Sequence, residues 1–320
     1  MNQDLDNASS HSEYQEIYNN TKPLPWVERN GFAHWVMAIG WVLVALIAFN
    51  IVGAIVGVVG IFATVETLDM ETILEQLSSN FDILFLANSS GQILIMALAT
   101  LLVVKLHAVK GDRKNFLRLK LSENVWQVTS LAAILFIVAQ PTILFLGWLN
   151  SFVPVPQAMA EMQETMAEMI SNFLKSDNVL LLGIFHIGVV PAVCEEIMYR
   201  GYVQRAFEKS WGIVAAILIS GAIFGAYHLQ ISNFLPLATL GVFLAYVTYI
   251  SDSLIPAIVA HFINNGGQVI ASNFYPEMLD EQISPEMDIP VLLVLLSFVL
   301  TAGILYYLYT MRPQEDQISR

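Results

Sequence analysis

Long runs of apolar residues are the feature that most constrains what this chain can fold into. Residues 35–64 form one such run without a single ionisable side chain before the final turn. About 20 helical residues cross the roughly 30 Å hydrocarbon core of a bilayer. Only helices and closed barrels satisfy their backbone hydrogen bonds in lipid, and runs of this length are too long for barrel strands. The sequence therefore predicts an all-α fold, a polytopic transmembrane helical bundle.

The same pattern recurs along the chain and predicts about eight spans. Only 13% of the residues are charged, whereas soluble domains carry about 25%. The predicted spans are residues 35–64, 83–106, 126–149, 179–199, 212–229, 234–250, 254–271 and 289–309. The fifth to seventh are short and follow one another closely, which predicts a compact bundle around a buried site.

We expect one membrane domain over residues 32–312, between a disordered cytoplasmic tail at 1–31 and a short cytoplasmic tail at 313–320. The first apolar run is too long for the core of a cleavable signal peptide. Between the third and fourth spans, Met159, Met162, Met166 and Met169 recur at helical spacing. They predict an amphipathic outer helix at 157–174 that packs its methionine stripe against the bundle.

The distribution of lysine and arginine predicts the orientation in the membrane. With a cytoplasmic N-terminus and eight spans, all of the 14 basic residues except Lys175 fall on or near the inner side. Basic loops stay inside, so both termini should lie in the cytoplasm and the protein in the cell (inner) membrane. The net charge of −13 then belongs to the outer loops. Such a chain is expected to have the lipid bilayer as a partner and no nucleic acid.

Ionisable side chains within the spans gather in the second half of the chain. They are functional candidates because each is costly in lipid. Glu196 and Arg200 stand four apart and can form an ion pair. Adjacent helical residues point about 100° apart, so Glu195 faces elsewhere, without a cation, and is a candidate general base. The alternative is that both glutamates belong to a salt-bridge network at the inner leaflet.

Two histidines and an amide complete this set. His228 lies in the fifth predicted span, and His261 and Asn265 share one face of the seventh. Asn264 is a weaker competitor for the amide role. With a free carboxylate, these groups could supply a base for water, metal ligands and donors for an oxyanion. Each could instead be a structural hydrogen-bonding residue, which membrane helices commonly use.

Other polar residues carry weaker expectations. His186 is expected to be structural, and His11, His34 and His107 are expected at the interface or in solvent. Cys194, the single cysteine, is expected to be a packing residue. One cysteine excludes an intramolecular disulfide and a structural thiolate zinc site.

Three motifs follow one another on successive predicted spans. They are Glu-Glu-x-x-x-Arg at 195–200, Phe-x-x-x-His at 224–228 and His-x-x-x-Asn at 261–265. In this order they resemble the CAAX protease and bacteriocin-processing (CPBP) family of membrane peptidases. The resemblance covers roughly residues 125–275, which would be the catalytic core of the membrane domain.

The resemblance implies an intramembrane endopeptidase that acts near the cytoplasmic leaflet on a peptide or lipidated peptide. Its role would be CAAX processing, or bacteriocin processing and self-immunity. A water activated by Glu195, with His228 as partner, would attack the peptide carbonyl. Arg200 would hold Glu196 as a supporting carboxylate. His261 and Asn265 would stabilise the oxyanion.

The resemblance also leaves a metal open. Zn²⁺ would lie near Glu195, His228 and His261, because zinc takes about three protein ligands and keeps one open position in catalytic sites. No His-Glu-x-x-His motif is present in the sequence. A metal-free glutamate mechanism is the alternative.

Two other functions compete with the peptidase. A non-catalytic membrane immunity or scaffold protein should have lost motif residues, and an ion-coupled transporter should show inverted repeats; the sequence shows neither sign. One expectation conflicts with the motif set. Glu195 falls near the inner end of its predicted span, whereas His228 falls at the outer end of the next. A break near Gly221 or Gly225, or a kink at Pro191, could bring them together.

Overall fold

The computed structural model describes residues 23–64, 80–175, 179–279 and 283–312, and every regular element in these ranges is helical. The predicted all-α fold is therefore confirmed. The expected tail at 313–320 and most of the tail at 1–31 lie outside the described residues, as does His11.

The helices run in the following order. The first half contains α2 (Trp26–Arg29), α3 (His34–Phe62), α5 (Phe81–Gly91), η1 (Gln92–Ala99), α6 (Thr100–His107), α7 (Arg113–Phe116), α8 (Val125–Val138), α9 (Gln140–Asn150) and α10 (Gln157–Lys175). The second half contains α11 (Leu180–Gly183), η2 (Ile184–Val189), α12 (Val190–Glu196), η3 (Ile197–Val203), α13 (Gln204–Tyr227), η4 (Ile231–Asn233), α14 (Phe234–Ser251), α15 (Ile255–Phe274), η5 (Pro276–Leu279) and α16 (Val291–Thr310).

Fewer helices qualify as membrane spans than the eight expected. In the described ranges, five helical runs are long and apolar enough, or six if α8 and α9, bent by 49°, form one span. Two expected spans, 179–199 and 212–229, lie in a single run, Leu180–Tyr227. The expected span at 254–271 is helix α15, which is long enough but carries His261, Asn264, Asn265 and Gln268 in place of apolar residues.

The run Leu180–Tyr227 reverses direction at Gly212, whose φ of 78° and ψ of 175° are not helical. A positive φ of this kind suits glycine, which has no Cβ to clash. The two arms pack side by side, because the Tyr199 ring lies 5.2 Å from Phe224 and 5.7 Å from Tyr227. Tyr199 and Phe224 are nearly equidistant from Gly212 in sequence, so Glu195 and His228 also come to similar depths.

This turn corrects the predicted end of the fourth span. The span was expected to end at Tyr199 because Arg200 follows it, but Arg200 is fully buried and the helix continues toward Gly212. The breaks considered at Gly221 and Gly225 are absent, since both residues lie within α13. Pro191 stands in the first turn of α12, directly after the wide turns of η2.

Gly221 and Gly225 do not break α13 but allow it to pack closely against α14. A Cβ on Gly221 would lie 2.7 Å from the backbone nitrogen of Val242, and one on Gly225 would lie 2.8 Å from that of Ala238. Small residues at such positions let helix backbones approach each other in membranes. The seam between α13 and α14 therefore depends on these glycines.

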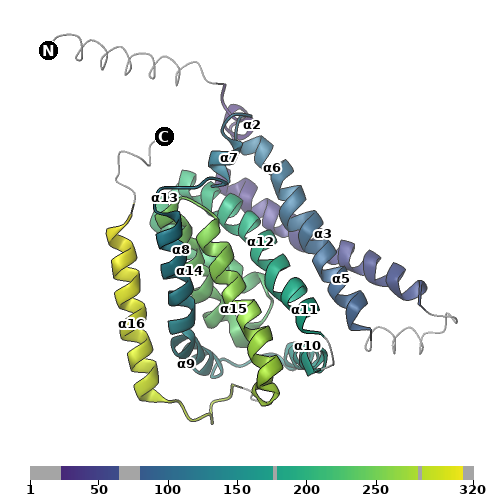
Figure 1. Cartoon of the computed structure of the whole chain (residues 1–320). Coiled ribbons are helices and arrows are strands. Elements are labelled where there is room, and N and C mark those ends of the chain that lie inside the picture. Colours follow the sequence, from purple (N-terminus) through teal and green to yellow (C-terminus); the bar gives the residue numbers. More distant parts are fainter. Residues whose placement is uncertain (1–22, 65–79, 176–178, 280–282, 313–320) are drawn as a thin grey trace.

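The two ends of the bundle differ in charge. Figure 1 shows α2, α7 and the C-terminal end of α16 at one end, with α9 and α10 at the other. Helices α2, α6 and α7 carry basic residues in their last turns, and the basic residue of α10 is Lys175. We call the end with α2 and α7 the basic end.

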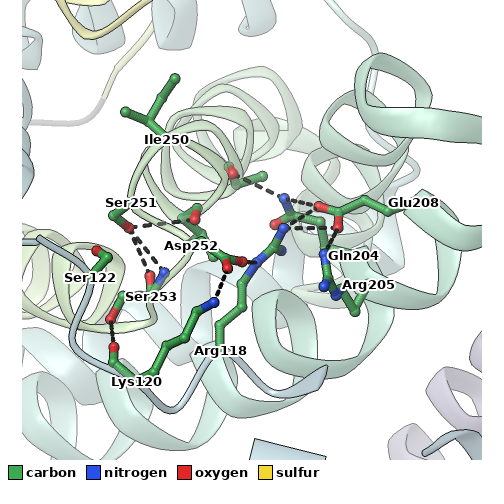
Figure 2. Close-up of polar contacts among 12 residues, drawn as sticks. Arg118, Lys120, Ser122, Gln204, Arg205, Glu208, Ile250, Ser251, Asp252 and Ser253 are labelled. Carbon is green, nitrogen blue, oxygen red and sulfur yellow. Dashed lines mark hydrogen bonds and ion pairs between the residues drawn. The ribbon is translucent and has the colours of Figure 1, made fainter. Parts of the chain in front are cut away.

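An ion-pair network ties three segments together at the basic end (Figure 2). Arg118 Nη2 lies 2.8 Å from both carboxylate oxygens of Glu208, and Arg118 Nε lies 3.0 Å from Asp252 Oδ1. Lys120 also pairs with Asp252. Burial alone would raise the pKa of the Asp252 carboxyl, but Arg118 and Lys120 outweigh it and hold that pKa below its usual value. The connection before α8, helix α13 and the α14–α15 turn are thereby joined.

Two histidines expected at the interface or in solvent are buried. His107 is fully buried and His34 is 8% exposed, and their Nδ1 atoms lie 2.8 Å apart. Glu28 and the Tyr202 hydroxyl bind their outer nitrogens at 3.0 and 2.9 Å. The expectation was wrong because the two rings bond each other across 73 residues of sequence, with further partners on α2 and η3.

Other expectations stand as follows. His186 pairs with the Ser89 hydroxyl at 2.7 Å, and Cys194 is buried in the core. Helix α10 is amphipathic and buries Phe173 and Leu174. Its methionine stripe does not pack as expected, since Met162 and Met166 are about half exposed.

Candidate active site

Glu196 is the centre of a buried polar cluster between α12 and α15. Its Oε1 lies 2.9 Å from His261 Nδ1 and 3.2 Å from Arg200 Nη1. Glu196 and Arg200 are fully buried, and His261 is 4% exposed. A carboxylate only accepts hydrogen bonds, so Nδ1 of His261 carries the proton that it donates. The ion pair expected from the spacing of Glu196 and Arg200 is present.

Arg200 links this cluster to the two neighbouring helices. Its Nη2 donates to the carbonyl oxygen of Gly241 at 3.0 Å, and its guanidinium stands 4.6 Å from the centre of the Phe224 ring. Arg200 lies in η3, a π-helical segment directly after the glutamate pair. Such segments are frequent at functional sites. Arg200 thus joins η3 to α13 and α14 while it neutralises Glu196.

The other nitrogen of His261 meets an amide. Asn265 Nδ2 lies 3.2 Å from His261 Nε2 and 3.2 Å from the carbonyl oxygen of Ile187. Asn264 donates to Asn265 Oδ1 at 3.0 Å and accepts from Gln140 at 3.2 Å. The chain of polar contacts therefore runs from Glu196 through His261 to the two asparagines.

His228 lies one residue beyond the last residue of α13 and faces the same region. Its Nδ1 donates to the carbonyl oxygen of Phe224 at 2.8 Å, which leaves the lone pair on Nε2 of the neutral ring available. A cavity of about 30 Å³ lies beside it. The polar residues that line this cavity are His228, His261, Asn264 and Asn265. A space of this size holds about one water molecule.

Glu195 lies on a different face of α12 from Glu196. It is 7% exposed, and in the described part of the chain its Oε2 has no hydrogen-bond partner and its carboxylate forms no ion pair. Tyr199 stands four residues after Glu195, and the Tyr227 ring packs edge to face against Tyr199. Glu195 does not line the small cavity.

The arrangement does not fit a zinc ion held by Glu195, His228 and His261. Within the described ranges, no three His, Cys, Asp or Glu side chains gather closely enough to hold a metal. Both ring nitrogens of His261 are engaged, by Glu196 and by Asn265. The ring would have to give up the Asn265 contact to offer a lone pair to a metal.

The three motifs are thus brought together in space, on η3, α12, the end of α13 and α15. Residues 177–267 match the Rce1-like family, the type II CAAX prenyl endopeptidases. The chain carries an Rce1-like domain. All six expected catalytic residues lie within the Rce1-like segment. The family is one of proteases, and its match together with several apolar helices points to a multi-pass membrane protein. No curated protein and no solved structure matches the chain significantly.

Sequence reasoning did not single out Tyr199 and Tyr227, the two tyrosines beside Glu195 in the Rce1-like domain. The spacing of four between Glu195 and Tyr199 could have indicated the first, since such residues share a helix face. Nothing in the sequence indicates Tyr227, which reaches Glu195 only because the chain reverses at Gly212.

Proposed function

We propose that this protein is an intramembrane endopeptidase in which Glu195 activates the attacking water. One observation carries the proposal. Arg200 and His261 engage Glu196, whereas Glu195 is buried beside it without a cation or a hydrogen-bond partner for Oε2 among the described residues. A general base needs a free lone pair within reach of water. Glu195 has one and carries no ion pair. Glu196 also has an unpartnered oxygen, Oε2, but its Oε1 is engaged by Arg200 and His261, which commits this carboxylate to holding α12, η3 and α15 together.

The proposed step balances as follows. The water oxygen attacks the peptide carbonyl carbon while a water proton passes to the Glu195 carboxylate. The Nε2 lone pair of His228 accepts the other hydrogen of the water and orients it. The tetrahedral intermediate then collapses, the C–N bond breaks, and Glu195 gives its proton to the leaving nitrogen. No step requires a metal.

Asn265 is the proposed donor for the oxyanion. Its Nδ2 hydrogens now contact His261 and the carbonyl oxygen of Ile187. The substrate oxygen would replace the Ile187 carbonyl, while His261 keeps the amide oriented. A positioned amide donor of this kind lowers the barrier of acyl transfer.

We infer that the basic end faces the cytoplasm, because basic segments remain inside. Both termini would then be cytoplasmic, in the cell (inner) membrane. His261 stands six residues after Ile255, the first residue of α15, hence about 9 Å below the basic end at 1.5 Å per residue. Glu195 and His228 stand 17 and 16 residues from the turn at Gly212, hence about 25 Å along their helices from it. The peptide bond would accordingly be cut inside the bilayer, below its cytoplasmic surface.

A second cavity supports a substrate with an apolar group. It has a volume of about 380 Å³ and is lined by Gly225, Ala226 and Leu229 at the end of α13, together with residues of α9, α10 and α14. It lies next to His228 along the chain. We propose that the substrate is a lipidated peptide of the CAAX type, and that bacteriocin processing is the second substrate class to test.

The test is cleavage of a quenched-fluorescence peptide panel, with and without a prenyl group, by the full-length protein in detergent. We expect Glu195→Gln to lower kcat by about three orders of magnitude. Glu164→Gln, an exposed glutamate on α10, serves as the matched control and should retain full activity. Equal activity of the wild type and Glu195→Gln would refute the mechanism and favour a non-catalytic membrane immunity or scaffold protein.

A further inference from the structure

Two tyrosine hydroxyls and one carboxylate oxygen are buried together without hydrogen bonds. They are Tyr199 Oη, Tyr227 Oη and Glu195 Oε2, none of which has a partner within the described residues. The Tyr199 side chain is fully buried. Buried polar groups in folded proteins are almost always hydrogen-bonded, so each exception needs an explanation. The other unpartnered atoms nearby, Glu196 Oε2 and Arg200 Nε and Nη1, belong to an ion pair, whereas these three have no such explanation and indicate a common partner.

The three groups converge from both arms of the run that reverses at Gly212. Tyr199 stands one turn after Glu195, on the same face of the helix. The rings of Tyr199 and Tyr227 meet edge to face, with centres 5.7 Å apart.

The chemistry of this trio is complementary to water. A phenolic hydroxyl donates one hydrogen bond, whereas an ionised carboxylate can only accept. A water between them donates to Glu195 and accepts from a tyrosine. Hydrogen bonds donated to a carboxylate or to its bound water favour the ionised form over the protonated acid. The same contact would place the water beside His228, the neighbour of Tyr227.

We propose that Tyr199 and Tyr227 are positioning residues: one hydroxyl donates to the water that Glu195 activates and the other donates to the Glu195 carboxylate, so that the water keeps one lone pair for the attack. The proposal rests on the proposed function of Glu195. It assigns a task to two residues at unspecified positions within the first two motifs. It also gives a function to two hydroxyls that phenylalanine would lack.

Other ionisable groups surround Glu195 and remain unchanged in the test below. On its own helical run these are Cys194, Glu196 and Arg200. Helix α15 contributes His261, and the end of α13 contributes His228. Segment η2 contributes His186, which is bonded to Ser89, and η1 contributes no ionisable residue. A change in the titration midpoint of Glu195 after one tyrosine hydroxyl is removed can therefore be assigned to that tyrosine.

The first experiment does not depend on activity. The carboxylic-acid infrared band of Glu195 is identified in the full-length protein by its absence from Glu195→Gln, and it is titrated with pH. We expect Tyr199→Phe and Tyr227→Phe each to move the midpoint upward by about one pH unit. Tyr246→Phe is the matched control, since that hydroxyl donates to Leu305 and lies in α14. Unchanged midpoints in both tyrosine variants would overturn the proposal.

The second experiment measures peptide cleavage against pH. Glu195 acts as a carboxylate, so the rate falls on the acidic side as it becomes protonated. Loss of a hydroxyl should move this acidic limb to higher pH and lower kcat about tenfold, with KM nearly unchanged. The melting temperature should fall little, because the substitution removes a single hydrogen bond, worth about 1 kcal/mol, without removing an ion pair. A lower melting temperature together with an unchanged acidic limb of the pH–rate profile would mean that the tyrosine has a structural role only.

The two proposals fail in different ways. If Glu195→Gln retains wild-type cleavage, the proposed function is wrong, whatever the tyrosines do. If Glu195→Gln is inactive but Tyr199→Phe, Tyr227→Phe and the double variant match the wild type in midpoint and rate, only the positioning role is wrong.

Discussion

His261 Nδ1 lies 2.9 Å from Glu196 Oε1, although 65 residues separate them in sequence. Arg200 meets the same oxygen, so this carboxylate has a cation and an imidazole as partners while Glu195 has neither among the described residues. Two adjacent glutamates with the same chemistry therefore stand in opposite situations. Glu196 is tied into the bundle by two partners, and Glu195 is the carboxylate that the proposed function uses as the base.

This contrast predicts opposite effects on stability. Glu196→Gln should lower the free energy of unfolding by about 3–5 kcal/mol, because it leaves Arg200 charged and unpaired in the interior. Glu195→Gln should change it little, since no ion pair is lost. Thermal unfolding in detergent measures both. Equal destabilisation by the two substitutions would contradict this division of roles.

The seam between α13 and α14 predicts a second difference. Gly221→Ala should destabilise the protein by about 1–3 kcal/mol, because the new methyl group meets the Val242 backbone, which cannot move aside cheaply. Gly303→Ala, on α16, is the control, as no atom of another described segment lies within 4 Å of where its methyl group would stand. The difference between the two melting temperatures is the quantity to compare. A milder effect at Gly221 than at Gly303 would show that the helices are not in close contact.

The Arg118 network predicts a pH dependence at the basic end. The pKa of Asp252 is lowered in the folded protein, so its contribution to stability is fully present above its unfolded value of about 4. The contribution is lost as pH falls through the lower folded value. Asp252→Asn should therefore destabilise the protein at neutral pH, by about 1 kcal/mol for this partly exposed pair. The wild type and variant should converge in acid.

Asparagine is a fair replacement at this position. Asp252 has a φ of 46°, and asparagine tolerates the left-handed region nearly as well. Unfolding curves recorded over a range of pH would settle the point. A difference between wild type and Asp252→Asn that persists unchanged below the folded pKa would point to a packing effect instead of charge.

The geometry of His261 predicts that peptide cleavage does not need zinc. A membrane-permeant chelator should leave the rate unchanged, and added Zn²⁺ should not raise the melting temperature, because His261 has no free lone pair to offer. Metal analysis of the purified protein provides an independent check. Loss of activity on chelation, restored by Zn²⁺, would show that Asn265 releases His261 to a metal.

Much of the fold could be predicted because its signals are local. Long apolar runs predict helices, and the spacing of Glu196 and Arg200 predicts an ion pair. A reversal between the expected spans 179–199 and 212–229 follows from the sequence, but its form does not: both arms belong to one helical run that turns at Gly212. The burial of Arg200 could not be predicted, because its partners Phe224 and Gly241 lie on α13 and α14, far from it in sequence.

The candidate site was predicted as a set of residue types, not as a geometry. That His261 bonds to Glu196, and that Asn265 bridges His261 and Ile187, depends on contacts across 65 and 78 residues. The same holds for the buried pair His34 and His107, which looks like two surface histidines in sequence. These polar residues form hydrogen bonds with partners distant in sequence, and such pairs cannot be predicted from composition.

Helix α15 has a consequence for how the protein is made. Its polar residues keep it below the hydrophobicity of the helices that qualify as spans, so it is a poor candidate to leave the translocon alone. We expect it to enter the lipid as a hairpin with α14, to which it is joined by the short turn at Asp252. Glu196 and Arg200 are synthesised earlier, so they enter the membrane before His261 is available to bond to Glu196. A ribosome-released chain that stops after α14 should accordingly be degraded by membrane quality control faster than the complete chain.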